Sequence, residues 1–290
     1  MDVRSRTIDV MGLRTRVLES GDASARESAL LIHGVGAWAE VWRDVMEPIA
    51  ATGRRAIAFD LPGFGESDPP GRVSHFGPHR SFYATFVPAL LDALEVQTAH
   101  LVGSSMGGSI AYIAAVEAPE RTRSLSFISG GGLGTSIAVN LRVATLPGSV
   151  LLARLLGRTS HARAVLRSCF FDASRIPEQL YEEIERYGLR TYPEFVSALR
   201  SGVTLRGVRA DVRAHWIGRL SRYSGPVLIV WGREDAVLPV THVAHAKDLL
   251  PQAQVRIIER CGHLPMVERT EEFLGAFLPF IDGAEGAAAA

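Results

Sequence analysis

Short apolar segments alternate with helical patterns along most of this chain. Residues 7–10 and 13–19 alternate in polarity around a Met-Gly turn, which predicts an antiparallel opening pair of strands. Apolar segments of strand length follow at 29–32, 55–59, 99–102, 124–128, 226–231 and 255–258. Helical spacing recurs between them, at 40–50, 81–94, 106–118, 240–250 and 271–281. The alternation predicts an α/β fold, in which helices cover both faces of a mostly parallel, doubly wound sheet.

Residues 133–222 break this alternation. They show no strand pattern, but helical patterns recur at 149–156, 177–187 and 194–205. We expect an all-helical insertion, a cap, over the carboxyl ends of the strands, where open α/β sheets bind ligands. The core would then comprise residues 1–132 and 223–283. The Ala-rich residues 284–290 are expected to form a frayed tail.

Composition excludes several classes of function. Basic and acidic residues balance at 31 each among 290 residues, so no global field attracts nucleic acid. No apolar segment is long enough to cross a bilayer, and the first residues lack the apolar centre of a signal peptide. Cys169 and Cys261 lie in different contexts, which argues against a disulfide framework or a zinc site and makes the cytoplasm the default location. We expect a small-molecule substrate and neither cofactor nor metal; the sequence leaves a homo-oligomer open without indicating one.

The stretch from Leu101 to Gly108 carries the clearest chemical signal. It contains a G-x-S-x-G pattern centred on Ser105, between a buried strand and a small-residue helix. A strand that turns directly into a helix holds such a serine in strained backbone geometry and lifts its hydroxyl clear of the sheet. The Met106 N–H then stands at a helix start, where it can donate to an anion. The pattern alone arises often by chance, so the flanking strand and helix give it its weight.

A serine hydroxyl near neutral pH needs a base beside it and an acid that orients the base. His263 follows the apolar segment 255–258, and Asp235 follows the segment 226–231. Glu234 competes with Asp235 for the acid role. The chain order of serine, aspartate and histidine is the order expected of the nucleophile-elbow fold.

The turn His33-Gly34-Val35-Gly36 follows another inner strand. Its glycines admit a close backbone approach, so the Val35 N–H is expected to converge with the Met106 N–H on an oxyanion. The alternative is a simple glycine turn. Further candidate substrate contacts are Gly34, Gly36, Phe64, Ser104 and Leu264, although core packing is the alternative for Phe64.

Five motifs together carry a family resemblance: HGVG, DLPGFGES, GSSMGG, WGRED and CGHLPMVE, in this order. With them the chain resembles the α/β-hydrolase fold superfamily, among its serine hydrolases with a helical cap. The resemblance implies Ser105 as nucleophile, Asp235 as triad acid and His263 as base, with the amides of Val35 and Met106 as oxyanion donors. A serine at the elbow speaks against the dehalogenases and epoxide hydrolases of this superfamily, which carry aspartate there.

The leading expectation for the reaction is hydrolysis of a small or medium carboxylic ester with an apolar part under the cap. The alternative is carbon–carbon hydrolysis of a vinylogous diketone acid, as in the similar meta-cleavage-product hydrolases. Those enzymes usually have Asn where Ser104 stands and often Trp where Leu264 stands, which weakens this alternative. An arginine of the cap could hold the carboxylate of such a substrate. Candidates for that arginine are Arg142, Arg154, Arg158, Arg163, Arg167, Arg186 and Arg190. A ligand sensor on the same fold is a third hypothesis.

Overall fold

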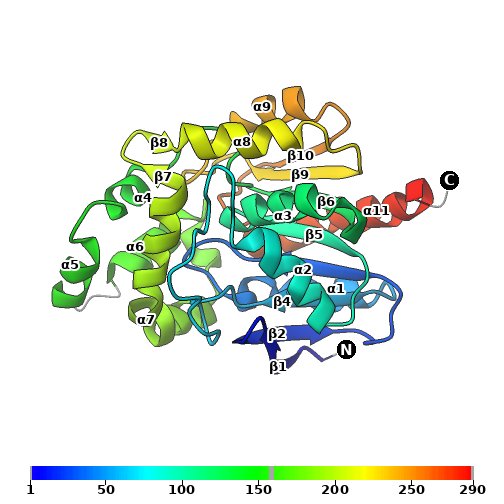
Figure 1. Cartoon of the computed structure of the whole chain (residues 1–290), viewed down its shortest axis with the longest axis horizontal. Helices are drawn as coiled ribbons and strands as arrows, with labels where there is room; N and C mark the ends of the chain where they lie inside the picture. Colours follow the sequence, from blue (N-terminus) through cyan, green and yellow to red (C-terminus); the bar gives the residue numbers. More distant parts are fainter. Residues whose placement is uncertain (1, 157–159, 289–290) are drawn as a thin grey trace.

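An eight-stranded sheet forms the centre of the molecule in a computed structural model that describes residues 2–156 and 160–288 (Figure 1). Its strand order is β1-β2-β4-β3-β5-β6-β9-β10, and only β2 runs against the others. The bounds are β1 Arg4–Val10, β2 Leu13–Ser20, β3 Ser28–Ile32, β4 Arg55–Phe59, β5 Ala99–Ser104, β6 Thr122–Ile128, β9 Val227–Gly232 and β10 Gln254–Ile258. The expected mostly parallel sheet is confirmed.

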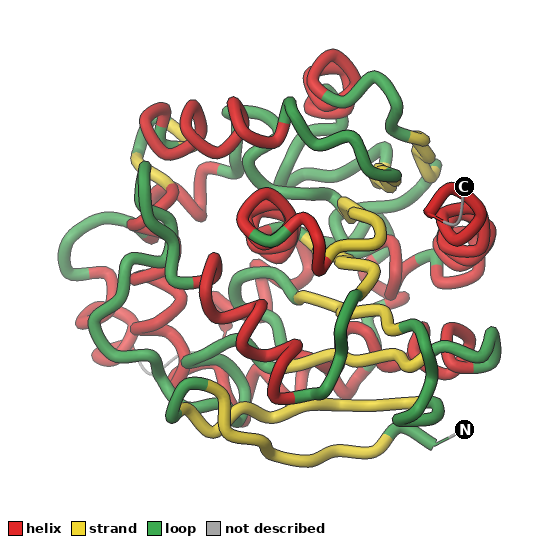
Figure 2. The backbone as a smooth tube through the Cα atoms, turned by 45° about the vertical axis from the view of Figure 1, so that its right-hand side comes forward, coloured by secondary structure: helices red, strands yellow, loops and turns green. Residues whose placement is uncertain are grey.

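Helices cover both faces of this sheet (Figure 2). Those outside the segment between β6 and β9 are α1 Arg43–Ala50, α2 Tyr83–Ala93, α3 Met106–Glu117, α9 His242–Leu249, α10 Pro265–Glu268 and α11 Thr270–Ala288, with 3-10 turns η1 Ala39–Trp42 and η2 Pro119–Arg121. The helix α11 continues through residues 284–288, part of the stretch for which a frayed tail was expected. Residues 289–290 lie outside the described residues.

The buried strands divide their side chains between two hydrophobic clusters. Along β3, Leu30 and Ile32 belong to the cluster that includes α2 and α3, whereas Ala29 and Leu31 belong to the cluster that includes α1 and α11. Successive side chains of a strand point to opposite faces, so an uninterrupted apolar strand supplies both layers. This explains why the inner strands are continuously apolar in the sequence.

The insertion between β6 and β9 forms one end of the molecule (Figure 1). Its elements are α4 Val139–Ala144, α5 Ser149–Leu156, α6 Ser160–Ser168, η3 Ala173–Arg175, α7 Glu178–Gly202, β7 Val203–Thr204, β8 Gly207–Val208 and α8 Ala210–Leu220. The ladder of β7 and β8 departs from the expectation of an all-helical insertion. Two-residue strands are too short to show a period of two in the sequence.

The long helix α7 also differs from the sequence prediction, which divided it into two. Pro193 lies inside it, yet the helix continues for 25 residues. Its buried residues Leu180, Ile184 and Tyr187 before the proline and Val196 and Leu199 after it keep one face against the protein. We infer that burial of this continuous face outweighs the roughly 3 kcal/mol that a proline costs within a helix.

The described part of the chain contains no helix that is both long and apolar enough to span a bilayer. Across residues 2–156 and 160–288, no three side chains of His, Cys, Asp or Glu gather in a way that could hold a metal ion.

The junction of β3, β5 and α3 is packed backbone against backbone. A Cβ on Gly107, in the first turn of α3, would overlap the carbonyl oxygen of Ile32 in β3. A Cβ on Gly103, in β5, would overlap the carbonyl of Gly107 itself. The two glycines of the G-x-S-x-G pattern therefore set how closely the helix approaches the sheet.

We predict that Gly107→Ala lowers the free energy of unfolding by about 2–4 kcal/mol, because the backbone of Ile32 cannot yield without moving the sheet. Urea unfolding followed by circular dichroism measures this change. Gly218→Ala is the matched control: Gly218 is a helical glycine of α8 with nothing near its missing Cβ. The Gly218→Ala change should raise the free energy of unfolding by up to about 1 kcal/mol. A Gly107→Ala protein as stable as the wild type would contradict the packing argument.

Glu183 is a buried carboxyl on α7, with only 7% of its surface exposed. Burial raises its pKa to about 8, and the nearby carboxylates of Glu40 and Asp60 act in the same direction. A hydrogen bond from the Gln179 amide (Nε2 to Oε1, 3.2 Å) and the charge of Arg16 oppose this shift without cancelling it. The folded protein therefore holds a proton that the unfolded chain releases near its ordinary pKa of 4.5.

Because the pKa of Glu183 is raised on folding, its contribution to stability is lost as the pH rises from about 4.5 to about 8. Glu183→Gln should therefore stabilise the protein by about 1–3 kcal/mol at pH values above this window, with the difference shrinking below pH 5. Urea unfolding across this pH range is the measurement. Glu182→Gln, a change at the exposed neighbour, should keep the pH dependence of the wild type. Identical profiles for the two variants would contradict the assignment.

Candidate active site

Ser105 occupies the turn between β5 and α3 with a left-handed backbone, at φ 53° and ψ −121°. Non-glycine residues adopt such angles at a cost of about 1–3 kcal/mol, so surrounding contacts must hold them. The Ser105 N–H donates to the carbonyl of Ile128 in β6 at 3.0 Å. The Ser105 carbonyl accepts from the N–H groups of Gly108 (3.0 Å) and Gly131 (2.7 Å). The next strand and the glycine loop after it therefore fix the position of this serine.

His263 and Asp235 meet in the loops that follow β10 and β9. The imidazole Nδ1 lies 2.7 Å from Asp235 Oδ2, and both residues are buried. The other carboxylate oxygen, Oδ1, accepts from the N–H groups of Val237 (2.8 Å) and Leu238 (2.9 Å). Asp235 accepts a hydrogen bond from the Nδ1–H group, which leaves Nε2 as the nitrogen able to take a proton. This geometry suits a base oriented by an acid.

Two glutamates hold the loop that carries His263. Glu234, the competitor for the acid role, instead accepts the N–H of Cys261 at 2.9 Å. Glu268, which is 2% exposed, accepts the N–H of Gly262 at 2.7 Å. Carboxylates that accept backbone N–H groups make strong, charge-assisted hydrogen bonds. The two residues that precede His263 are therefore each held by a carboxylate, Cys261 by Glu234 and Gly262 by Glu268.

Glu268 also reaches into the insertion. Its two oxygens accept the N–H groups of Phe171 (3.1 Å) and Asp172 (2.7 Å), and the His263 N–H donates to the Cys169 carbonyl at 2.6 Å. The segment between α6 and α7 is thus fastened to the histidine loop. Glu268 is the last residue of the CGHLPMVE motif, and the sequence alone predicted no role for it. An acidic residue closing a mostly apolar motif was the signal that could have found it.

The HGVG turn lies directly beside Ser105. A Cβ on Gly34 would lie 2.9 Å from Ser105 Cβ and 3.5 Å from Ser105 Oγ, so this position admits glycine alone. The turn is fixed by His33, whose Nδ1 is 2.7 Å from the Gly34 carbonyl and whose Nε2 accepts the Leu61 N–H at 2.9 Å. Burial lowers the pKa of His33 to about 4, so this imidazole is neutral and bonds in both directions.

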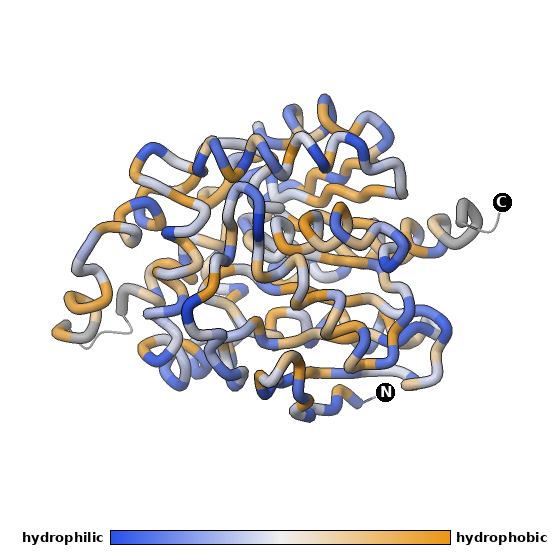
Figure 3. The backbone as a smooth tube through the Cα atoms, in the orientation of Figure 1, coloured by the Kyte–Doolittle hydropathy of each residue, from blue (hydrophilic) through white to orange (hydrophobic). Residues whose placement is uncertain are grey.

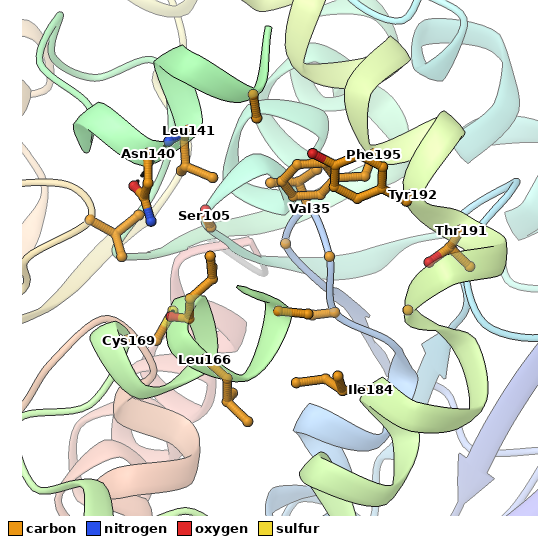
Figure 4. A pocket seen from close by; sticks show the side chains of 18 of the residues that line it. Val35, Ser105, Asn140, Leu141, Leu166, Cys169, Ile184, Thr191, Tyr192 and Phe195 are labelled. Atoms are coloured by element: carbon orange, nitrogen blue, oxygen red, sulfur yellow. Dashed lines mark hydrogen bonds between the residues drawn. The ribbon is translucent and has the colours of Figure 1, made fainter. Parts of the chain in front are cut away.

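Ser105 and His263 both line a cavity of about 820 Å³ beneath the insertion (Figure 4). Gly34, Val35, Gly36 and Leu264 line it as well. The other two candidate contacts, Ser104 and Phe64, do not line the cavity. Both are fully buried, and the Phe64 ring packs edge-on against the His33 ring with 5.7 Å between the ring centroids. Met106 is also outside the described lining.

The cavity walls are mainly apolar and come from α4, α5, α6 and α7. Figure 4 shows Ile184, Tyr192 and Phe195 on the α7 side and Leu141 and Leu166 on the opposite sides. The polar lining residues are Ser105, His263, Asn140, Ser149, Cys169, Thr191 and Tyr192. Arg, Lys, Asp and Glu are absent from the described lining. Burial raises the pKa of the Cys169 thiol to about 12, which keeps it neutral.

The arginines proposed as carboxylate ligands lie elsewhere. Arg142 donates to the Leu205 carbonyl at 3.3 Å, and Arg163 pairs with Glu185. On α7, Arg186 pairs with Glu66 at 3.0 Å and Arg190 donates to the Gly65 carbonyl. None of these four, nor Arg167, lines the cavity. Arg158 and the side chain of Arg154 lie outside the described residues.

Comparison with known proteins agrees with this architecture. A family model described as alpha/beta hydrolase fold matches residues 30–270. The chain is 30% identical over 282 residues to a 2-hydroxy-6-oxo-6-phenylhexa-2,4-dienoate hydrolase of Burkholderia cepacia, covering 95% of this chain and 94% of that protein. It is 32% identical over 266 residues to a dihydrolipoyllysine-residue acetyltransferase component of an acetoin cleaving system of Cupriavidus necator, covering 91% of this chain but only 66% of that protein.

Among solved structures, a membrane phospholipase A described as a bacterial virulence factor superposes with a TM-score of 0.81 at 29% identity. The match covers 98% of this chain and 87% of that structure. The family model and the relatives agree with the α/β fold described above. The protein is a hydrolase, and the chain belongs to the alpha/beta hydrolase fold family.

Proposed function

We propose that this protein hydrolyses carboxylic esters whose acyl or alcohol part is apolar, through an acyl-enzyme on Ser105. The observation that carries the proposal is the cavity: Ser105 and His263 open onto about 820 Å³ whose described lining holds no Arg, Lys, Asp or Glu. A substrate whose carbonyl reaches Ser105 places its remaining atoms among aliphatic and aromatic side chains. A neutral ester enters such a site without the cost of burying an unpaired charge.

In the proposed mechanism, Ser105 Oγ attacks the ester carbonyl while His263 Nε2 takes its proton. Asp235 orients the imidazole through the 2.7 Å contact to Nδ1 and stabilises the imidazolium that forms. The amides of Val35 and Met106 stabilise the oxyanion, supported by the close approach of Gly34 to Ser105. The alcohol leaves with the proton from His263, and water then cleaves the acyl-enzyme by the same route.

The relative from Burkholderia cepacia, named as a dienoate hydrolase, favours a second candidate: carbon–carbon cleavage of a keto acid. Such a substrate carries a carboxylate. An ionised carboxylate buried without a cation costs several kcal/mol, and the described lining offers hydroxyls, an amide, a thiol, the Trp38 indole and the imidazole but no Arg or Lys. The structure named as a phospholipase A, at 29% identity, favours ester cleavage, because phospholipases hydrolyse esters. We therefore place ester cleavage first.

The test is a series of p-nitrophenyl esters of increasing acyl length, assayed beside a 2-hydroxy-6-oxo dienoate. We expect kcat/KM to rise with acyl length, because each added CH₂ gains about 0.8 kcal/mol of burial until the cavity is full. Ser105→Ala should lower kcat by about 1000-fold or more while its unfolding midpoint stays near that of the wild type. Ser221→Ala, at an exposed serine after α8, is the control and should leave turnover unchanged.

A dienoate cleaved much faster than every ester would replace the first candidate with the second. Retained ester turnover in Ser105→Ala would refute the mechanism for both. Single-turnover behaviour with all substrates would favour a ligand sensor.

Glu268 is predicted to act on turnover through the position of His263. Glu268→Gln keeps the size of the side chain but only one acceptor oxygen, whereas the N–H groups of Gly262 and Asp172 donate to different oxygens of Glu268. A displaced imidazole should lower kcat about 10- to 100-fold with a smaller change in KM. Steady-state kinetics on the best ester measure this effect. Glu259→Gln is the control on the same loop: its partner is the exposed Arg233, and wild-type kinetics are expected. Equal kinetics for both variants would contradict the role of Glu268.

A further inference from the structure

The insertion carries most of the exposed apolar side chains of the described residues. We define the apolar rim as Val139, Val143, Leu146, Leu151, Leu152 and Leu155, on α4, α5 and the turn between them. Leu151 and Leu155 are 63% and 75% exposed. Scattered exposed leucines are ordinary on a protein surface, but a contiguous apolar group marks a surface that meets an apolar partner.

The apolar rim is continuous with the cavity. Val139, Val143 and Leu152 line the cavity and are also exposed, so they stand at its entrance. Leu151 and Leu155 lie on the same short helix but outside the cavity lining. Figure 1 shows α5 at the extremity of the molecule farthest from the C-terminus, and Figure 3 shows hydrophobic residues along it. A partner that covers the apolar rim therefore lies at the mouth of the proposed substrate site.

The chain segment that carries the apolar rim has charges of one sign. Residues 133–171 contain no Asp or Glu, although the whole chain balances 31 acidic against 31 basic residues. The segment carries Arg142, Arg154, Arg158, Arg163 and Arg167. Arg200 of α7 adds to them, because it donates to the carbonyl of Leu146 at 2.6 Å. Exposed leucines beside arginines, with no carboxylate in the segment, form the composition that binds anionic lipid surfaces.

We propose that the apolar rim docks on the surface of a bilayer that contains anionic phospholipid. The side chains of Leu151 and Leu155 enter the boundary between headgroups and acyl chains, and Arg142 and Arg200 face lipid phosphates. Docking places the cavity entrance against the layer in which apolar esters dissolve. The supply of ester substrate from the bilayer rests on the proposed function, whereas the docking itself does not.

A second copy of the chain is the competing occupant. In a two-fold symmetric dimer the same patch faces itself. The segment 133–171 would then meet another segment that has arginines and no carboxylates, so like charges would face one another across the contact. An anionic lipid surface complements this charge, which is why we assign the apolar rim to it.

Binding is tested with the Ser105→Ala protein, so that no lipid is hydrolysed during the measurement. Co-sedimentation compares vesicles of phosphatidylcholine alone with vesicles of equal parts phosphatidylcholine and phosphatidylglycerol. We expect the partition coefficient to be about tenfold or more higher on the anionic vesicles and to fall with added salt. Binding that ignores both lipid charge and salt would overturn the proposal.

The double change Leu151→Asp with Leu155→Asp should lower partitioning onto anionic vesicles by about tenfold or more, because both side chains leave the lipid and add negative charge. Met11→Asp is the matched control. Met11 is 56% exposed on the turn between β1 and β2, outside the insertion, and its change should leave binding intact. Circular dichroism verifies that both proteins are folded. Equal loss of binding in the control and the double variant would overturn the assignment to the apolar rim.

Two further measurements separate this proposal from the proposed function. Turnover of a short, water-soluble p-nitrophenyl ester by otherwise wild-type protein should be the same with and without the Leu151→Asp and Leu155→Asp changes, since neither residue lines the cavity. Absent turnover together with rim-dependent vesicle binding would refute the proposed function and leave the docking supported. Normal turnover without vesicle binding would overturn the docking alone. A concentration-dependent dimer that the double change dissociates, without vesicle binding, would assign the apolar rim to a second copy.

Discussion

The left-handed backbone at Ser105 is the constraint on which the rest of the site depends. A serine at φ 53° is unfavourable, and it persists because its own amide and carbonyl are bonded to Ile128, Gly108 and Gly131. Those bonds require α3 to lie close against the sheet. The glycines at 103 and 107 allow that approach, because any side chain there would overlap backbone atoms. The same packing that stabilises the junction of β5 and α3 therefore creates the exposed hydroxyl.

Buried carboxylates organise the loops at the carboxyl edge of the sheet. Asp60, after β4, accepts the N–H groups of Ala39 (2.9 Å) and Glu66 (2.8 Å); Asp235 and Glu268 accept backbone N–H groups in the same manner. Loops at this edge cannot complete their hydrogen bonds by strand pairing, so side chains must accept from them. Burial raises the pKa of Asp60, and the charge of Arg16 opposes this. The acidic residues of the motifs thus serve loop geometry as well as chemistry.

The sheet and the positions of Ser105, His263 and Asp235 could be predicted because each depends on local patterns. Apolar strand segments and glycine-flanked turns mark the carboxyl edge directly in the sequence. The role of Glu268 could not be predicted, because its partners Phe171 and Asp172 are almost a hundred residues away. The continuous α7 was also missed, since Pro193 indicates a break and only tertiary burial opposes it. Phe64 was ambiguous because an aromatic residue beside a glycine turn fits a pocket wall and a core equally well.

The insertion divides into two parts by charge, and the division matches what each part contacts. After residue 171 two of its carboxylates reach the core: Glu194 Oε1 lies 2.7 Å from His75 Nε2, and Glu183 is buried near Glu40. Tyr187 on the same helix donates to Glu66 at 2.6 Å. Before residue 171 the segment has arginines, exposed leucines and no acidic residue. Carboxylates held by the core fix one wall of the cavity, whereas the other wall presents apolar groups outward. The α7 wall of the cavity is therefore fixed by contacts with the core. The exposed α4 and α5 form its entrance, so a surface that covers these helices determines the polarity at the entrance.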